Sequence, residues 1–144
     1  DSKNLTFRNS IVGPDMNPGG IGLLNWFMGQ PGPVKGFTGA IWTGLTTLEL
    51  AKAMEYEAGE NVHGLVNMVP EGSINKFDLL QLFNRELRGG SIEIVPDAGL
   101  QLDKTLVRTN FEPTYRPKSY PDQVRELAGW IRKHKELYPH YEVI

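Results

Sequence analysis

The stretch "GAIWTGLTTLELAKAM", residues 39–54, is the most informative part of the chain because it contains a well-defined helix start. If Thr46 is the N-cap residue, Glu49 stands three residues later, which is the capping-box pattern. Leu45 and Leu50 then occupy the two positions of a hydrophobic staple. We therefore predict that a helix begins directly after Thr46.

Two further segments have the same kind of helix start. Asn75 is followed three residues later by Asp78, and Ser119 is followed in the same way by Asp122. Both segments continue with apolar residues at helical spacing: Phe77, Leu80, Phe83 and Leu87 in the first, and Val124, Leu127, Ala128 and Ile131 in the second. Glycines at 89–90 end the first of these helices.

The remaining regular segments are short. The patterns at 5–12 ("LTFRNSIV"), 64–70 ("GLVNMVP") and 91–97 ("SIEIVPD") predict strands. Residues 21–29 predict a short buried helix, and residues 30–39 ("QPGPVKGFTG") predict a loop with a short extended piece at 34–38. This order predicts an α/β or α+β fold with few strands and about four helices.

Length and composition limit the class of protein. A chain of 144 residues with 40% hydrophobic content suits one core, so we expect a single unit, residues 1–144. The net charge of -2 and the absence of Lys and Arg runs argue against nucleic acid and anionic membranes as partners. No apolar run approaches the roughly 20 residues that span a bilayer. Because there is no cysteine, disulfides and thiolate chemistry are excluded, and the cytoplasm is the default compartment.

A search for reactive groups gives mostly negative results. The three histidines, His63, His134 and His140, lie far apart in the sequence without the spacing of zinc ligands, so we interpret them as solvated surface residues and expect no metal site. The segment "NPGGIG" lacks the spacing and the lysine of a phosphate-binding loop. Glu49 is accounted for by its capping role. The aromatic residues between Trp26 and Trp42 form either core or the wall of a pocket for a ring-shaped ligand.

Four segments taken together resemble one family. They are "LTFRNSIVGPD", "LLNWFMGQPGPVKGFTGAIWTGLTTLELAKAM", "GLVNMVPEGSINKFDLLQLF" and "LDKTLV". In order and spacing they resemble the C-terminal half of extended short-chain dehydrogenases that act on nucleotide sugars, in the branch of dTDP-4-dehydrorhamnose reductases and sugar-nucleotide epimerases. The resemblance implies an α/β fold that is the C-terminal part of a Rossmann-like enzyme.

The resemblance also implies that catalytic parts lie elsewhere. Enzymes of this family carry an N-terminal unit with a Gly-rich turn and a catalytic Tyr-x-x-x-Lys pair, and this sequence contains neither pattern. Hydride transfer needs a bound nicotinamide and a proton donor within reach. We therefore expect no catalytic residue in this chain and no binding of NAD or NADP by the chain alone, although the longer parent would use one of them. Since the sequence begins with Asp, we expect a fragment or a processed chain.

The site residues follow from the resemblance. Asn9, Ser10 and Ile11 match the family segment beside the nicotinamide and the sugar, and Ser10 would also contact the coenzyme. Asn25, on the short helix, and the loop 34–37 would line the nucleotide end of the substrate.

Trp42 marks a departure from the family pattern. It stands where many relatives place an arginine that grips the diphosphate, and an indole offers one N–H but no charge. Lys35 and Arg108 are then the candidates for holding the phosphates, or this branch reads its substrate differently. We expect the loop to present Trp42 and Thr43 to the substrate cleft, and the alternative is that Trp42 is only packing.

The predicted function is the substrate-binding portion of an NAD(P)-dependent sugar-nucleotide reductase, similar to dTDP-4-dehydrorhamnose reductase and inactive alone. Two alternatives stay open: the same portion of an NAD-dependent sugar-nucleotide epimerase or dehydratase, and a free-standing, non-catalytic binding module. The expected partner is a nucleotide sugar, with no nucleic acid or membrane. An unpaired first strand would be an edge able to pair with a second copy, so a homo-oligomer also stays open.

Overall fold

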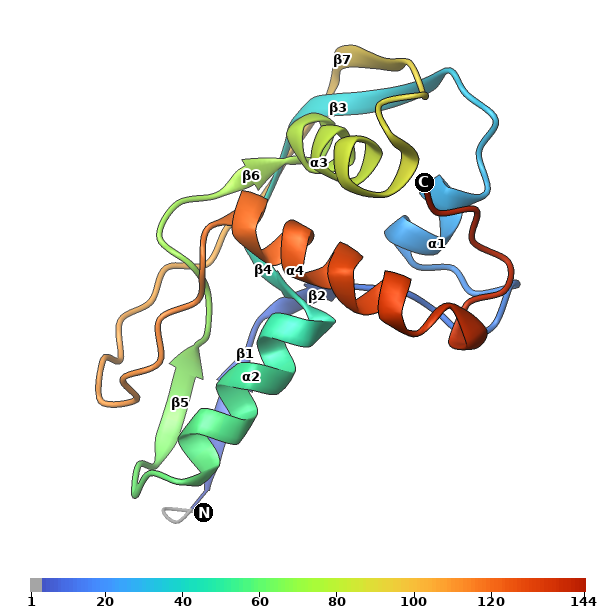
Figure 1. The fold of residues 1–144 in the computed structure, drawn as a ribbon. Helices are drawn as coiled ribbons and strands as arrows, with labels where there is room; N and C mark the ends of the chain where they lie inside the picture. Colours follow the sequence, from blue (N-terminus) through green and yellow to red (C-terminus); the bar gives the residue numbers. More distant parts are fainter. Residues whose placement is uncertain (1–3) are drawn as a thin grey trace.

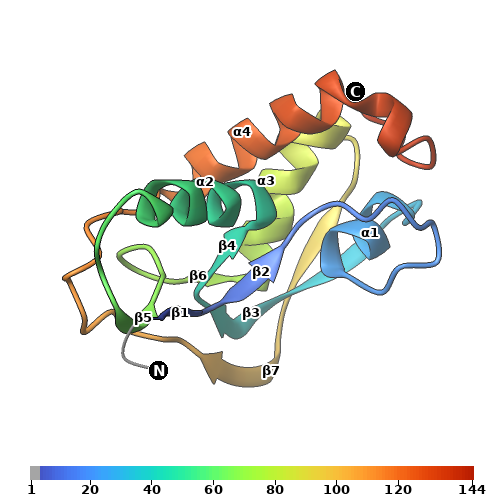
Figure 2. The ribbon, with the colours of Figure 1, turned by 90° about the horizontal axis from the view of Figure 1, so that it is seen from below.

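The computed structural model describes residues 4–144 and shows helices packed on short strands (Figure 1). In chain order the elements are β1 (Leu5–Arg8), β2 (Ser10–Val12), α1 (Leu23–Met28), β3 (Val34–Trp42), β4 (Gly44–Thr46), α2 (Thr47–Ala58), β5 (Gly64–Asn67), β6 (Ile74–Asn75), α3 (Lys76–Arg88), β7 (Ile94–Lys104), α4 (Tyr120–Lys133) and the 3-10 helix η1 (Lys135–Leu137). In Figure 2, α2, α3 and α4 lie together in the upper part of the view, and β3 and β7 lie below them. The mixture of helices and parallel strands confirms the predicted α/β class.

The strands of the described residues form three small sheets. β3 is central in the largest, parallel to β7 and antiparallel to β6. β1 pairs with β5, and β2 pairs with β4, both in parallel. At the end of β3, Trp42 lies opposite Ile74 on β6 and Lys104 on β7. The chain segments that leave β3 and β7 therefore start from the same edge of the sheet.

Two clusters of buried side chains hold these layers together. The larger one joins α1, α3 and α4 to β3, and its fully buried members include Leu24, Phe27, Phe83, Leu87, Ala128 and Ile131. The smaller one lies beneath α2 and consists of Leu45, Ala53, Val66 and Met68. The apolar stripes predicted for the third and fourth helices face the larger core, as expected from their spacing.

All three predicted N-caps are confirmed. The side-chain oxygen of Thr46 accepts a hydrogen bond from the N–H of Glu49 at 3.1 Å. Asn75 caps α3 in the same way at 2.7 Å, and Ser119 caps α4 at 3.4 Å. Gly89 follows α3 in the left-handed conformation with φ 60, which suits a residue without a β-carbon.

The role predicted for the Glu49 side chain is wrong. In a full capping box its carboxylate would accept the N–H of the N-cap residue. Here the N–H of Thr46 instead donates to Oε1 of Gln123 on α4 at 3.0 Å. The Glu49 carboxylate is 1% exposed and accepts hydrogen bonds from Tyr115 and Lys118. The Glu49 carboxylate is therefore bonded to Tyr115, 66 residues further along the chain, and not to the backbone of its own helix start.

The segment before α2 is strand rather than loop. β3 runs from Val34 to Trp42, where only a short extended piece was expected. Its glycines allow close packing instead of marking a turn: a β-carbon on Gly36 would lie 2.8 Å from the Cα of Phe77, and one on Gly39 would lie 2.6 Å from the carbonyl oxygen of Leu100. The predicted first strand is present but divides between β1 and β2 because its two halves pair with different strands.

His140 differs from the expected solvated histidine. Its Nε2 lies 3.1 Å from Oδ1 of Asn25, and its Nδ1 is buried without a hydrogen-bond partner in the described part of the chain. The ring also packs edge-on against Tyr141.

Within residues 4–144, none of the helices combines the length and the apolar character needed to cross a lipid bilayer.

Candidate functional site

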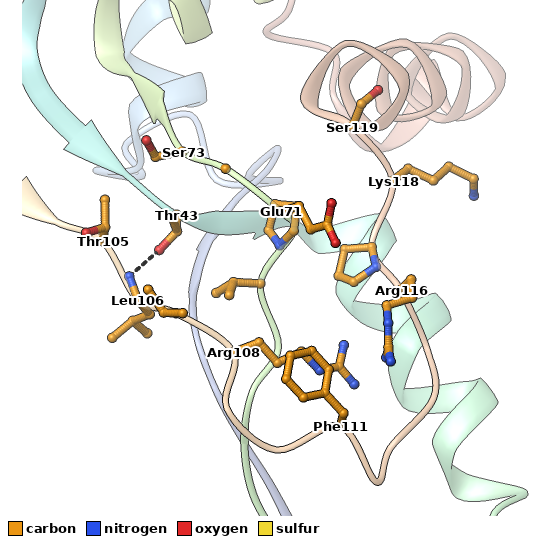
Figure 3. A pocket seen from close by; sticks show the side chains of 15 residues that line it. Thr43, Glu71, Ser73, Thr105, Leu106, Arg108, Phe111, Arg116, Lys118 and Ser119 are labelled. Carbon is orange, nitrogen blue, oxygen red and sulfur yellow. Dashed lines mark hydrogen bonds between the residues drawn. The ribbon is translucent and has the colours of Figure 1, made fainter.

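Within residues 4–144, a cavity of about 960 Å³ lies where the chain leaves β3 and β7, and a smaller one lies beside Trp42. The wall of the larger cavity comes from Thr43, the turn 69–73 between β5 and β6, and the irregular segment 105–119 that leads into α4. Figure 3 shows Thr43, Thr105 and Leu106 on one side and Lys118 and Ser119 on the other, with Arg108, Phe111 and Arg116 along a third. A volume of this size is within the range of small-molecule sites.

Arg108 is a buried member of this wall. Its guanidinium donates to three backbone carbonyl groups of its own segment, those of Asn110 at 3.1 Å, Tyr115 at 2.6 Å and Pro113. Burial lowers the pKa of Arg108, and the nearby Arg116 lowers it further, while Glu57 acts in the opposite direction. Most of the guanidinium N–H groups of Arg108 are therefore used to hold the turn 110–115.

An exposed aromatic ring lies close to two guanidinium groups at the cavity. Phe111 is 57% exposed, and the Cζ atoms of Arg108 and Arg116 lie 5.7 Å and 5.3 Å from its ring centroid. These distances are within the range of cation–π attraction. Arg116 is the more accessible cation, since it donates only to the carbonyl groups of Pro113 and Tyr115 at 3.2 Å. This part of the wall combines a flat apolar surface with positive charge.

Lys118 faces away from the cavity centre in Figure 3. Its ammonium lies 3.1 Å from Glu126 and 3.8 Å from Glu49. The hydrogen bond with Glu126 is the main reason that the pKa of Lys118 is raised. Its charge is thus already paired within the protein.

The smaller cavity, about 210 Å³, brings together Ser10, Ile11 and Trp42. Lys76 and Lys104 also line it, and neither forms an ion pair within the described part of the chain. The Trp42 ring is half-buried, packs against the larger core and lies 5.9 Å from the ring of Tyr120.

Trp42 and Thr43 do not share a cavity. Trp42 lines the smaller one and Thr43 the larger one, as expected for neighbours in an extended chain, whose side chains point to opposite faces. Thr43 is 3% exposed, and its Oγ1 accepts a hydrogen bond from the N–H of Leu106 at 2.7 Å. Its hydroxyl therefore fastens the cavity wall (Figure 3).

Three predicted site residues lie outside both cavities. Asn25 is buried and uses its amide to hold the loop 17–20, with a hydrogen bond of 2.8 Å to the carbonyl oxygen of Gly20. Lys35 is exposed on β3, 3.8 Å from Asp97. Asn9 lies between β1 and β2, and its amide bonds to the carbonyl group of the next residue.

Phe111 and Arg116 were not predicted from the sequence, because residues 105–119 have no helical or strand periodicity. The available signal was the alternation of basic and aromatic residues in the Pro-containing run "RTNFEPTYRPK", residues 108–118. Among residues 4–144, no group of three or more His, Asp or Glu side chains is arranged to hold a metal ion.

No protein-family model matches the sequence, and no curated protein matches it either. Solved structures with a similar fold include dTDP-4-dehydrorhamnose reductase from Bacillus anthracis in complex with NADP (TM-score 0.70, 11% identity, 87% of this chain and 47% of that chain). GDP-L-fucose synthetase from Naegleria fowleri bound to NADP has a TM-score of 0.66 and 15% identity over 92% of this chain and 45% of that chain. UDP-N-acetylglucosamine 4-epimerase from Methanobrevibacter ruminantium in complex with UDP-N-acetylmuramic acid has a TM-score of 0.62 and 16% identity over 90% of this chain and 46% of that chain.

The chain therefore spans less than half the length of these structures. Identities this low establish the fold alone. They confirm the predicted similarity in fold to extended short-chain dehydrogenases that act on nucleotide sugars.

Proposed function

We propose that this chain is the substrate-binding portion of an NAD(P)-dependent enzyme that reduces a nucleotide sugar, similar to dTDP-4-dehydrorhamnose reductase. The coenzyme and the catalytic proton donor would come from a Rossmann half outside the 144 residues. The proposal is supported by the fold and by the share of the similar structures that the chain spans, 47% for the reductase. In this proposal the chain alone has no catalytic activity.

The observation that carries the proposal is the juxtaposition of Phe111 with Arg108 and Arg116 at a cavity of about 960 Å³. A nucleotide offers a planar base and a diphosphate. An exposed aromatic ring can stack on a base, and a guanidinium group can pair with phosphate oxygens through parallel hydrogen bonds. Arg116 has more donors left for a ligand than Arg108, which is occupied by carbonyl groups. We therefore assign the base to Phe111 and the diphosphate chiefly to Arg116.

In this proposal the ligand would pass from the larger cavity, on the Thr43 side of the extended chain, to the smaller cavity, on the Trp42 side, and would place its sugar there. Ser10, Ile11 and Trp42 line the smaller cavity, together with Lys76 and Lys104. An indole face and a hydroxyl suit the apolar and polar faces of a sugar ring. Lys35 lies away from both cavities on β3, so we give it a smaller part in the proposal than the sequence suggested.

We infer that the chain alone does not bind NAD or NADP tightly. Binding of a coenzyme pyrophosphate in this fold uses free N–H groups at the start of a helix after a Gly-rich turn. The helices α2, α3 and α4 begin with side-chain caps from Thr46, Asn75 and Ser119, and α1 has only six residues. A contact of Ser10 with the coenzyme remains part of the proposal only for the longer parent.

Titration of the 144-residue chain with dTDP-glucose, UDP-glucose and NADPH, followed by calorimetry, tests the proposal. We expect binding of at least one nucleotide sugar, no tight binding of NADPH and no NADPH oxidation. Arg116→Ala should weaken nucleotide-sugar binding by about tenfold, the loss expected for one charge-assisted contact. Arg125→Ala is the matched control, because Arg125 is exposed on α4 and pairs only with Asp122.

Two results would contradict the proposal. One is the absence of binding to every nucleotide sugar at millimolar concentration. The other is an equal effect of the two arginine substitutions.

Reduction and epimerisation can be distinguished only in a longer enzyme that carries the coenzyme half. The epimerase among the similar structures makes the corresponding portion of an epimerase the second candidate. A protein that binds nucleotide sugars but never joins a coenzyme half would be the free-standing binding module.

A further inference from the structure

The inward face of α2 carries two carboxylates at positions where an amphipathic helix normally carries apolar side chains. Glu49 and Glu57 are 1% and 3% exposed, whereas Met54 and Tyr56 on the same helix are 56% and 46% exposed. Ala53 lies between the two carboxylates at four-residue spacing and is fully buried. Because a buried carboxylate is costly unless it is hydrogen-bonded, the partners of Glu49 and Glu57 indicate what these residues do.

Both carboxylates bind the segment 105–119, which forms most of the wall of the larger cavity. Oε1 of Glu57 accepts the backbone N–H of Tyr115 at 2.8 Å. Oε1 of Glu49 accepts the phenol O–H of Tyr115 at 2.7 Å, and Oε2 of Glu49 accepts the N–H of Lys118 at 3.0 Å. Tyr115 therefore lies along α2, with its backbone near the end of the helix and its hydroxyl near the start.

The surroundings of Tyr115 reinforce this arrangement. Its ring packs against the smaller core and lies 5.5 Å from the ring of Tyr56, whose hydroxyl lies 2.8 Å from Oγ1 of Thr114. Burial, followed by the hydrogen bond to Glu49, raises the pKa of Tyr115, so the phenol stays a donor. The adjoining turn 110–115 is closed by the buried guanidinium of Arg108.

We propose that Glu49 and Glu57 are positioning residues for the larger cavity. Together with Tyr115 they form a carboxylate clamp, which holds residues 105–119 against α2. In this conformation the Phe111 ring and the guanidinium groups of Arg108 and Arg116 are placed at the ligand. The identity of that ligand rests on the proposed function, whereas the clamp itself rests on the contacts of α2 with Tyr115 and Lys118.

The structure predicts a specific response to substitution at position 57. Oε2 of Glu57 is buried and has no hydrogen-bond partner among residues 4–144, so Oε1 alone holds the N–H of Tyr115. Glutamine keeps one oxygen that can accept this N–H, whereas alanine removes it. Glu57→Gln should therefore preserve the clamp and Glu57→Ala should release it. Glu57→Met fills a similar volume without an oxygen, so it should release the Tyr115 N–H as Glu57→Ala does, whereas a side chain that only filled space would be replaced by methionine without effect.

Amide hydrogen exchange of the 144-residue chain, resolved by NMR, tests the clamp without any ligand. The Tyr115 and Lys118 amides lie outside helices and strands, so slow exchange there depends on the two carboxylates. In Glu57→Ala the Tyr115 amide should exchange about tenfold faster or more, as expected for losing a hydrogen bond to a charged group. In Glu57→Gln it should stay within about threefold of the parent rate. Core amides such as that of Ile131 serve as the reference.

A second variant keeps the test decisive if Glu57→Ala does not fold. Tyr115→Phe keeps the ring but removes the donor to Glu49, and it should accelerate exchange of the Lys118 amide relative to Ile131. Exchange unchanged in every folded variant would overturn the clamp. So would equal acceleration in Glu57→Gln and Glu57→Ala.

Titration of the same variants with dTDP tests the positioning role. We expect Glu57→Ala and Tyr115→Phe to bind dTDP about tenfold more weakly than the unsubstituted chain does. Glu57→Gln should bind dTDP nearly as well as the unsubstituted chain. Undiminished affinity in a variant with accelerated exchange would overturn the positioning role. If the unsubstituted 144-residue chain binds no nucleotide while the exchange pattern is as expected, the proposed function is wrong and the clamp is still supported.

Discussion

Replacing Trp42 with alanine should have two separable effects, one on stability and one on recognition of the sugar. The indole is half-buried against the larger core and lies 5.9 Å from the ring of Tyr120. It also rests on the backbone of Gly44, since a β-carbon there would lie 2.1 Å from Cζ2 of Trp42. Trp42 also lines the smaller cavity, as Ser10 does.

The size of the stability effect follows from the buried area. A buried aromatic side chain removes roughly 150–250 Å² from water, so a half-buried indole contributes ~2–3 kcal/mol at about 25 cal/mol per Å². Loss of the contact between the Trp42 and Tyr120 rings adds ~0.5–1 kcal/mol. A total of ~3 kcal/mol would lower the Tm of a chain of this length by about 10 °C. Trp26→Ala is the control, because Trp26 is 43% exposed and has no stacked ring within the described residues.

The binding effect is measured on the folded variant by titration with dTDP-glucose and with dTDP. If Trp42 contacts the sugar, affinity for dTDP-glucose should fall by roughly 5- to 30-fold, as for an aromatic contact worth about 1–2 kcal/mol. Affinity for dTDP, which has no sugar, should be unchanged. Equal affinity of parent and variant for dTDP-glucose would refute the proposed contact and leave Trp42 as packing alone. A fall in Tm no larger than that of Trp26→Ala would refute the estimate of its burial.

Three further predictions concern stability and are checked by urea unfolding. Thr46→Ala should cost ~0.5–2 kcal/mol through loss of the N-cap hydrogen bond and should leave dTDP affinity unchanged. Burial raises the pKa of Tyr120 to about 12, so the folded chain holds this proton more tightly than the unfolded chain does. Stability should therefore fall as pH rises from about 10 to about 12, by up to ~2.7 kcal/mol, and Tyr120→Phe should reduce this slope. Gly36→Ala should cost ~1–3 kcal/mol because its β-carbon would meet the backbone of Phe77 at 2.8 Å, whereas Gly22→Ala, with open space around it, should change stability by less than about 1 kcal/mol.

The helix starts could be predicted from sequence because their interactions are local. An N-cap bond joins residues three positions apart, so Thr46 and Glu49 contain most of the information needed. The α4 stripe is equally local, and its residues are buried as its spacing predicts. The similarity in fold could also be predicted, because the segments that carry it keep their order along nearly the whole chain.

Features that depend on distant partners could not be predicted in this way. The glycines of β3 look like loop residues, and only the close approach of Phe77 and Leu100 explains why a strand needs Gly36 and Gly39 there. The cavity wall at 105–119 has no periodicity, because its conformation comes from hydrogen bonds to other elements.

The sequence of α2 nevertheless contains a signal that could have located the site. Glu49, Ala53 and Glu57 recur at four-residue spacing, which is the spacing of a buried stripe on a helix. Charged residues at such positions are costly to bury, so they remain there only with specific partners. In this chain the partners belong to the irregular segment that forms the larger cavity. Carboxylates on the inward stripe of a helix therefore indicate that an irregular segment is held in a defined conformation, and in this chain that segment also carries Arg116, the cation best placed to meet a ligand.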